Sequence, residues 1–578
     1  MVYATCDSDS FSRELQEYKY RTNIKVLRND YNYTLQTNVK DVVCTCERKP
    51  IAKYILPTTE NVQHVISYPG CARVLFTAFM RQLRAPTRSP SPILISQYHK
   101  FCDKFFEKEI EPIIKDFSYD VEAWMNHLKT YNKQFEVLEF YNRYKKGELY
   151  HHSYADPENF VYTLFAKKEK QIVTDKKPKC RAISAAPPLV KFILGPVVQK
   201  LEKLLHGPLH GYKMSQGGKP CKTWHEMEEM YNSCYKEGLD TIIDIDGSAW
   251  DSTQHFDMKY LTHKIYKYLV EHNKIHHIDP ELFKKVALQR ERKLVAKCYI
   301  DGKTHIIFSA IIDGTTFSGS PDTTFMNTLT NLSLNHFIFD MYGIEDHLYK
   351  MNSAGDDYNT LISAELNTQQ LRDFIKEVWL DLGLLPKYVL HGGYDQITFC
   401  STNVIPYQTV DNETQFKIVR QMDRMIPLSL ISEKALSYSN GRLKYHYLEL
   451  SNGLKTWASE LPFYKEFIAA YMYQHDKIPQ PYELDKPGKQ KMRFEAVDDY
   501  DEESYSDMTK VRISQHNPEP KYVYNFLREK FGLLKENINQ IATSLKSKVL
   551  YSPYEPNETS CTMDPFIVTG KQIGRAHV

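Results

Sequence analysis

The sequence predicts an α+β protein in which helices flank an antiparallel sheet. Three observations lead to this fold class. Apolar residues recur at helical intervals in long segments such as 101–117 and 121–144. Short apolar runs enclose turn residues at 301–302 and around 354–357, which predicts hairpins. Hydrophobic residues make up 42% and charged residues 25% of the 578 residues, which is typical of a globular chain with a sizeable core.

The predicted elements follow one another in order. Residues 1 to about 235 indicate helices with short strands between them. A strand over 241–246 then precedes a helix in which Leu261, Ile265 and Leu269 recur at intervals of four. After the hairpins, the sequence predicts a helix over 371–382, strands at 397–401 and 415–419, and largely helical structure to about 473. A Pro-rich stretch over 478–490 indicates a linker, and 524–550 has a helical pattern.

Charge and cysteine content narrow the functional classes. The 74 basic and 72 acidic residues give a net charge of +2, but the stretch over 495–507 carries seven acids and no base, so the remainder has +9. This pattern fits a polyanion-binding body with an acidic tail, or simply a flexible linker. The 11 cysteines form no CxxC pair, and no signal peptide or spanning segment is evident. We therefore expect a reduced, cytoplasmic protein.

Carboxylates occur where turns are expected. Asp246 ends the predicted strand and Asp251 follows five residues later, while Gly355 permits a sharp turn that carries Asp356 and Asp357. Converging carboxylates without cysteines suit Mg²⁺ or Mn²⁺. Two such ions can activate a hydroxyl and stabilise a leaving phosphate oxygen, which indicates nucleotidyl transfer. Taken alone, an Asp pair after Gly is more often a solvated hairpin turn.

Two further segments accompany these acids. The basic stretch TDKKPKCRAISA carries Lys176, Lys177, Lys179 and Arg181, and its cations can hold a triphosphate. Downstream, TFSGSPDTTFMNT places Ser318 and Gly319 in a turn, with Thr323 and Asn327 four apart on one helix face. These hydroxyl and amide groups can read a ribose 2′-hydroxyl. The plain alternatives are a solvated basic face and a capped helix.

Together the segments resemble the RNA-dependent RNA polymerases of positive-strand RNA viruses. KPKCRAI is similar to motif F of that family, DGSAWD to motif A, SGSPDTTFMNT to motif B and AGDD to motif C, in the family's order. GLLPK and FCS resemble motifs D and E, and the FCS form is most similar to the tombusvirus-like and nodavirus-like polymerases. The likeness covers about 162–401. It implies a right-handed fold of fingers, palm and thumb.

The resemblance also implies roles for individual residues. Asp246 and Asp356 would bind two Mg²⁺ ions, for which Mn²⁺ can substitute, and Asp357 would assist them. Asp251 and Asn327 would select the ribose, supported by Ser318 and Thr323. Lys387 would protonate the pyrophosphate leaving group. The residues expected to contact the incoming triphosphate are Lys177, Lys179 and Arg181.

Seven regions follow from this likeness. They are an N-terminal extension with fingers (1–235), palm (236–262), a fingers insertion (263–309), palm (310–405), thumb (406–477), a linker with the acidic run (478–510) and a C-terminal helical appendage and tail (511–578). The expected partners are RNA template and product, ribonucleoside triphosphates and other viral replication proteins, in the host cytoplasm with only an indirect membrane association. A reverse transcriptase and a non-catalytic RNA-binding scaffold remain as alternatives.

Overall fold

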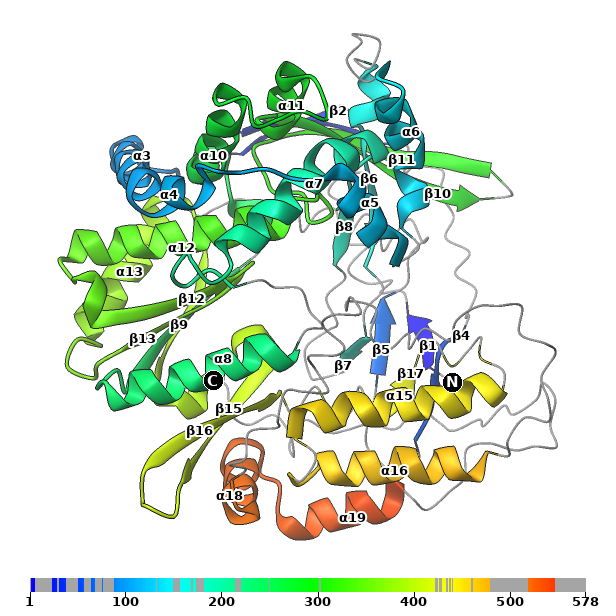
Figure 1. The fold of residues 1–578 in the computed structure, drawn as a ribbon, viewed down its shortest axis with the longest axis vertical. Coiled ribbons are helices and arrows are strands. Elements are labelled where there is room, and N and C mark those ends of the chain that lie inside the picture. The colour runs from blue at the N-terminus through cyan, green and yellow to red at the C-terminus, as the bar shows by residue number, and fades with distance from the viewer. Residues whose placement is uncertain are drawn as a thin grey trace.

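A computed structural model of the chain combines helices with largely antiparallel sheets (Figure 1). The α+β class predicted from the sequence is consistent with this arrangement. The structure describes residues 2–5, 23–28, 31–37, 50–56, 64–67, 75, 88–130, 133–148, 156–167, 170–172, 181–213, 220–248, 250–300, 303–421, 425, 429–432, 435, 438, 440–458, 461–478 and 518–545. Along those ranges, no helix is both long enough and apolar enough to cross a bilayer.

A four-stranded antiparallel sheet lies at the centre of the fold. Its strands run in the order β12 (Tyr349–Ala354), β13 (Asp357–Ile362), β9 (Thr241–Gly247) and β14 (Pro386–Gly392). Helices α12 (Thr323–Tyr342) and α13 (Gln369–Asp381) cover one face, and α8 (Pro220–Lys236) covers the other (Figure 1). Helices therefore cover both faces of the sheet, and most residues of β12, β13 and β9 are buried.

Alternation along the strands sorts side chains between the two faces. Ile243 and Ile245 pack in the cluster that includes α12, whereas Ile242 and Leu361 pack in the cluster that includes α8. Because successive side chains of a strand point to opposite faces, Asp244 and Asp246 belong to the same face as Ile242. This alternation decides where the acidic residues gather.

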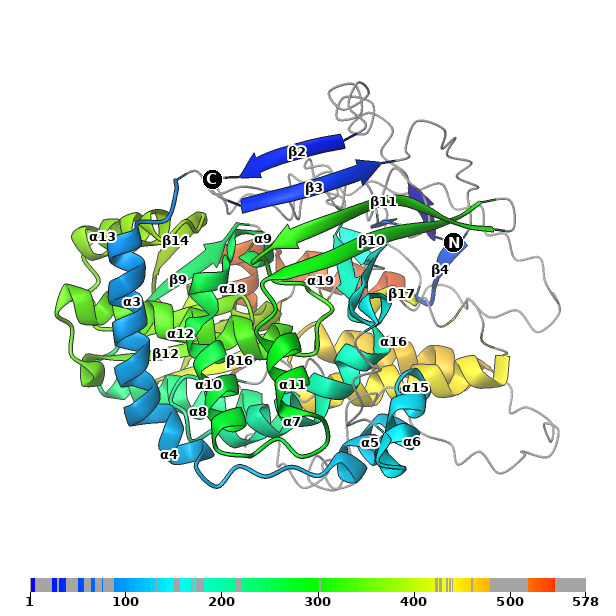
Figure 2. The ribbon, with the colours of Figure 1, turned by 90° about the horizontal axis from the view of Figure 1, so that it is seen from above.

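A six-stranded sheet lies beside the first one (Figure 2). Its order is β2 (Asn23–Arg28), β3 (Tyr31–Thr37), β11 (Lys303–Asp313), β10 (Glu291–Ile300), β6 (Tyr162–Ala166) and β8 (Ala182–Ala185). The long β10–β11 hairpin confirms the one predicted from the apolar runs, while its Asp301-Gly302 turn lies outside the described residues. A backbone bridge between Ala185 and Gly319 joins the end of β8 to the loop that precedes α12.

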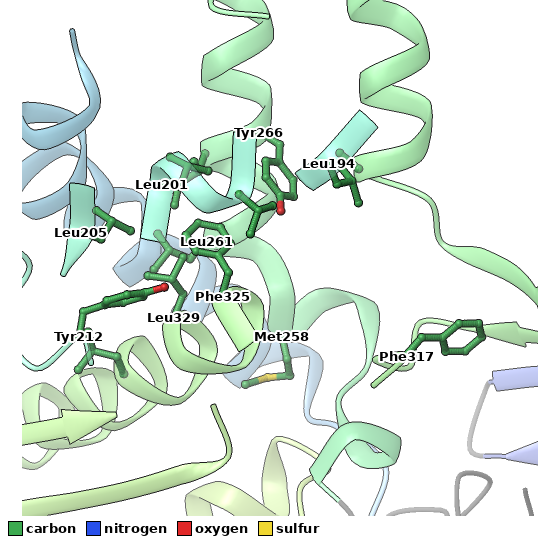
Figure 3. Packing of buried hydrophobic residues seen from close by; sticks show 14 of the residues in the cluster. Leu194, Leu201, Leu205, Tyr212, Met258, Leu261, Tyr266, Phe317, Phe325 and Leu329 are labelled. Carbon is green, nitrogen blue, oxygen red and sulfur yellow. The ribbon is translucent and has the colours of Figure 1, made fainter. Parts of the chain in front are cut away.

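The largest core packs helices against helices between these two sheets. Leu194, Leu201 and Leu205 of α7 (Pro188–Leu205) lie near Leu261 and Tyr266 of α10 (Tyr260–Glu271) and near Phe325 and Leu329 of α12 (Figure 3). Each of these side chains is at most 1% exposed. Burial of such residues stabilises the fold by about 1.5–3 kcal/mol each. The core thus anchors α12, on which several candidate site residues lie.

A second core lies toward the other end of the molecule. It joins α15 (Asn440–Ala458) and α16 (Tyr464–Lys477) to α18 (Pro520–Phe531) and α19 (Lys535–Leu545). The hydroxyl of Tyr447 donates a hydrogen bond to the carbonyl oxygen of Ile55 at 2.7 Å. Ile55 follows β4 (Pro50–Tyr54), which belongs to a five-stranded sheet with β17 (Ile431–Ser432), β1 (Val2–Thr5), β5 (His64–Ser67) and β7 (Lys170–Ile172).

Two predicted elements differ from those observed. The strand predicted at 397–401 is instead a 3-10 turn over Phe399–Ser401, because Cys400 and Ser401 have φ values of 50° and 60° and cannot continue an extended chain. The regular strand β15 (Thr402–Gln408) begins only after them and pairs with β16 (Thr414–Arg420). The C-terminal helical pattern is divided into α18 and α19 at Gly532, which has φ +66°.

Candidate active site

Three aspartates predicted to act together lie at one end of the central sheet. Asp246 is the penultimate residue of β9, and Asp356 and Asp357 lie at the turn that joins β12 to β13. Ala354 pairs with Asp357, so Gly355 and Asp356 form a two-residue turn. Gly355 has φ +67°, a conformation that glycine adopts without strain. The local sequence therefore determines this turn, while the register of β13 on β9 brings it next to Asp246.

The acidic end holds a fourth aspartate that the sequence interpretation missed. Burial, followed by the charges of Asp357 and Asp246, raises the pKa of Asp244 to about 7. The Thr398 hydroxyl opposes this shift by donating a hydrogen bond to Asp244 at 3.4 Å. The signal was present, since Asp244 precedes Asp246 by two residues and strand alternation sends both to one face.

Electrostatic crowding is strongest at Asp357. The residue is exposed at the end of its strand, but surrounding protein shields its carboxyl group. This desolvation, and then the charge of Asp356 and more weakly that of Asp246, raise the pKa of Asp357 to about 7. The thiol and backbone N–H of Cys400 donate hydrogen bonds to the carboxyl group and partly offset the shift. The left-handed turn at Cys400 thus has a local role beside the acids.

Lys387, which was predicted to protonate the leaving group, lies beside the carboxylates. Its ammonium group donates a hydrogen bond to Oδ2 of Asp246 at 2.6 Å. The two side chains are 52% and 39% exposed, so solvent screens the pair and its contribution to stability is small. Lys387 falls at an irregularity in the pairing of β14 with β9. This pairing connects the lysine to the acidic end across a sequence separation of 141 residues.

Asp251 and Asn327 form the predicted pair. The side-chain amide of Asn327 donates a hydrogen bond to Oδ1 of Asp251 at 2.9 Å. Asp251 lies in the short helix α9 (Trp250–Thr253), and Asn327 lies in the first turns of α12. Burial raises the pKa of Asp251 to about 6, although the Asn327 hydrogen bond opposes the change. The carbonyl oxygen of the Asn327 side chain is buried and has no hydrogen-bond partner within the described part of the chain.

The hydroxyls of Ser318 and Thr323 donate hydrogen bonds to backbone carbonyl oxygens. Ser318 donates to the carbonyl oxygen of Ala182 at 3.1 Å, and Thr323 donates to that of Phe317 at 2.6 Å. Thr323 also lies 2.8 Å from the carbonyl oxygen of Ser320. In this structure the two residues hold the loop before α12 in place, next to β8 and to the Asp251–Asn327 pair.

The basic stretch is only partly described. Arg181 is exposed and precedes β8, and its carbonyl oxygen accepts a hydrogen bond from the N–H of Lys167 at 2.7 Å. Lys177 and Lys179 lie outside the described residues. Arg181 thus approaches the loop of Ser318 through β8, since Ser318 bonds to Ala182.

The acidic end fits a divalent cation in charge and in donor type. Its side chains offer carboxylate oxygens, and the mutual repulsion that raises the pKa of Asp357 is the kind that a bound cation relieves. Among the residues that the structure describes, no three His, Cys, Asp or Glu side chains stand together as a ready-made set of ligands. Asp246, Asp356 and Asp357 would therefore have to turn toward an ion as it binds.

Comparison of the chain with protein-family models and with curated proteins finds no match.

Proposed function

We propose that the chain is an RNA-directed RNA polymerase that copies an RNA template from ribonucleoside triphosphates. The observation that carries the proposal is the hydrogen bond between Asp251 and Asn327 beside the acidic end of the sheet. The carboxylates at the acidic end would bind metal, while the neighbouring Asp251–Asn327 pair would contact the sugar of the incoming nucleotide. Either feature alone has many uses, but their combination fits nucleotide addition.

The acidic residues would serve phosphoryl chemistry. Asp246 and Asp356 would bind two Mg²⁺ ions, with Asp357 supporting them. When bound, the ions would lower the pKa of the attacking 3′-hydroxyl and neutralise charge on the leaving pyrophosphate. Lys387, whose side-chain nitrogen lies 2.6 Å from Asp246, would donate a proton to the pyrophosphate. Lys177, Lys179 and Arg181 would hold the triphosphate.

Ribose selection follows from unpaired polar groups. The buried side-chain oxygen of Asn327 has no partner in the described part of the chain, so it can accept a hydrogen bond from a ribose 2′-hydroxyl. A deoxynucleotide lacks this donor and would leave the oxygen unpaired in a site closed to water. Discrimination against deoxynucleotides is therefore expected, and this separates the proposal from a reverse transcriptase.

In this proposal the chain has the right-handed polymerase fold of fingers, palm and thumb. The sheet of β9, β12, β13 and β14, with α12, α13 and α8 against it, supplies the palm. The sheet that contains β10 and β11 supplies fingers, and α15 and α16 supply the thumb. The biological role would be replication and transcription of a positive-strand RNA virus genome, together with other viral replication proteins and with only an indirect membrane association.

The decisive experiment is extension of an RNA primer on an RNA template by the purified full chain with Mg²⁺. We expect incorporation of ribonucleotides and rejection of deoxynucleotides. Asp356→Ala should reduce the rate by at least roughly a hundredfold, because it removes a ligand of the ions that would stabilise the developing negative charge. Asp411→Ala is a matched control, since Asp411 is exposed in the turn between β15 and β16.

Each alternative predicts a different result. Efficient incorporation of deoxynucleotides on the RNA template would favour a reverse transcriptase. RNA binding without synthesis, across Mg²⁺ and Mn²⁺ and with several templates, would favour a non-catalytic scaffold. Equal rates for Asp356→Ala and Asp411→Ala would contradict the proposed role of the acidic end.

A further inference from the structure

Helix α12 carries polar side chains where a core helix normally carries apolar ones. Thr328, Asn331 and Asn335 are 0–1% exposed, although α12 lies within the main core. A buried polar group destabilises a fold unless it has a hydrogen-bond partner. The partners of these side chains therefore indicate why the sequence retains them.

The partners of Thr328 lie in the turn that carries Asp356. The N–H of Gly355 donates a hydrogen bond to the Thr328 hydroxyl oxygen at 2.8 Å. The same hydroxyl donates its proton to the carbonyl oxygen of Thr324 at 2.8 Å, so its lone pairs are oriented toward the turn. In return, the hydroxyl of Ser353 donates to the carbonyl oxygen of Thr328 at 3.0 Å. Thr328 is thus bonded both to the end of β12 and to the first residue of the β12–β13 turn.

Asn331, about one helical turn further on, contacts the next residue of the same turn. Its amide nitrogen lies 3.4 Å from the carbonyl oxygen of Asp356, at the long end of hydrogen-bond distances. The orientation of this amide is defined, because Asn335 donates to Oδ1 of Asn331 at 3.0 Å. Asn335 in turn accepts from the indole N–H of Trp379 in α13 at 3.4 Å. The contact of Asn331 is supported by a chain of buried polar groups.

Thr328 directly follows Asn327, which bonds to Asp251. One turn of α12 therefore contacts α9, which carries Asp251, and the turn between β12 and β13, which carries Asp356. A displacement of α12 would move the two contacts together. A rigid element that holds two parts of a site in register is a general means of preorganisation.

We propose that Thr328 is a positioning residue that holds the Gly355-Asp356 turn so that the Asp356 carboxylate can bind a divalent cation. The inference rests on the proposed function, because it assumes that Asp356 is a metal ligand. It assigns to Thr328 no contact with substrate or metal. It states that the hydroxyl group, and not merely the volume of the side chain, determines cation affinity.

The test is Mn²⁺ binding to the full chain, followed by the electron paramagnetic resonance signal of free Mn²⁺. Thr328→Val keeps the shape of the side chain but leaves the Gly355 N–H without its acceptor. We expect Mn²⁺ affinity to fall roughly tenfold, the lower end of the range for loss of a group that orients a metal ligand. Thr328→Ser keeps the hydroxyl and should stay within about threefold of the unaltered chain.

A matched control exists on the same helix. Thr330 is 1% exposed, and its hydroxyl has no hydrogen-bond partner in the described part of the chain. Thr330→Val makes the same chemical change in the same core without touching the turn. Its Mn²⁺ affinity should equal that of the unaltered chain. Equal affinities for Thr328→Val and Thr330→Val would overturn the inference.

Failure of this inference can be distinguished from failure of the proposed function. If Asp356→Ala and the unaltered chain bind Mn²⁺ equally, the metal site itself is wrong and both proposals fall. If Asp356→Ala loses binding while Thr328→Val retains it, only the role of Thr328 is wrong. Should Thr328→Val not fold, Ser353→Ala decides instead: roughly threefold weaker binding supports the inference, and unchanged binding overturns it.

Discussion

The pKa values of Glu202 and Asp357 are both raised, but for different reasons. Burial alone raises the pKa of Glu202 in α7 from 4.5 to about 7. At Asp357 the charges of Asp356 and Asp246 add to the effect of burial. A cation bound at the acidic end would offset the repulsion at Asp357, whereas no neighbouring acid contributes to the shift at Glu202. The raised pKa of Glu202 therefore marks a cost to stability, whereas that of Asp357 reflects its place at the acidic end.

Glu202 leads to a prediction about stability and pH. The folded-state pKa lies above the unfolded value, so the carboxyl group is neutral in both states below about pH 4.5 and costs nothing there. Between about pH 4.5 and pH 7 the carboxyl group ionises in the unfolded chain before it ionises in the folded one. The folded state therefore loses stability as the pH rises through this interval. Glu202→Gln should remove this loss, raising the free energy of unfolding at pH 8 by up to about 3 kcal/mol and by little at pH 4.5.

Denaturant unfolding at the two pH values measures this difference. Glu365→Gln provides the comparison, because Glu365 is exposed in the turn after β13. A similar gain in both variants at pH 8 would attribute the effect to net charge rather than to the burial of Glu202.

At the scale of elements, the loop before α12 is held against β8. The Ala186 N–H donates to the carbonyl oxygen of Gly319 at 3.2 Å, and Ala185 and Gly319 form a backbone bridge. A Cβ on Gly319 would lie 2.6 Å from the carbonyl oxygen of Ser184 and 2.9 Å from the Cα of Ala185. Only glycine lets the two backbones approach this closely. The loop therefore ties the strand after Arg181 to the start of α12.

We expect Gly319→Ala to be destabilising although it adds one methyl group. The obstructing atoms belong mainly to the backbone of β8, so they cannot move aside as a flexible side chain does, and the cost should be about 1–3 kcal/mol. Primer extension should weaken as well, because the loop carries Ser318 and leads to Asn327. Thermal and denaturant unfolding of the full chain measure the first effect.

Substitution of Gly453 by alanine is expected to change stability in the opposite direction. It lies inside α15, and a Cβ there would meet nothing within 4 Å. Gly453→Ala should stabilise the chain by about 0.5–1 kcal/mol, since alanine loses less backbone entropy in a helix. Equal effects of the two substitutions would contradict the close approach at Gly319.

At the scale of the whole molecule, charge is distributed unevenly along the sequence. The net charge is only +2, but the run over 495–507 holds seven acids, so the remaining residues carry +9. This run lies outside the described residues. A body with this charge can bind a polyanion through phosphate contacts, while the acidic run would repel it.

We therefore expect binding of single-stranded RNA to depend strongly on salt. For about five phosphate contacts, affinity should fall roughly a hundredfold between 50 and 200 mM salt, because binding releases condensed counterions. Fluorescence anisotropy of a labelled RNA measures the slope. An affinity that stays flat over this range would contradict phosphate binding by the chain.

The sequence alone determined the features that depend on neighbouring residues. The period of Leu261, Ile265 and Leu269 predicted a helix that is observed as α10, and Gly355 predicted the turn between β12 and β13. Helix α13 was predicted within a few residues of its ends. Helical periodicity and turn chemistry are local, so they can be read from the residues of one segment.

Only the tertiary structure decided which distant groups meet. Asp251 and Asn327 are 76 residues apart in sequence, and Lys387 and Asp246 are 141 apart. Their positions depend on strand register and helix packing, which no single segment encodes. The same reason explains why Cys400 and Thr328 were missed, since each gains its place beside the acids from a contact with another element. Asp244 is different, because strand alternation places it on the face of Asp246 and could have indicated it. The sequence thus determined the chemical groups and their local turns, while tertiary packing determined which of these groups lie next to one another.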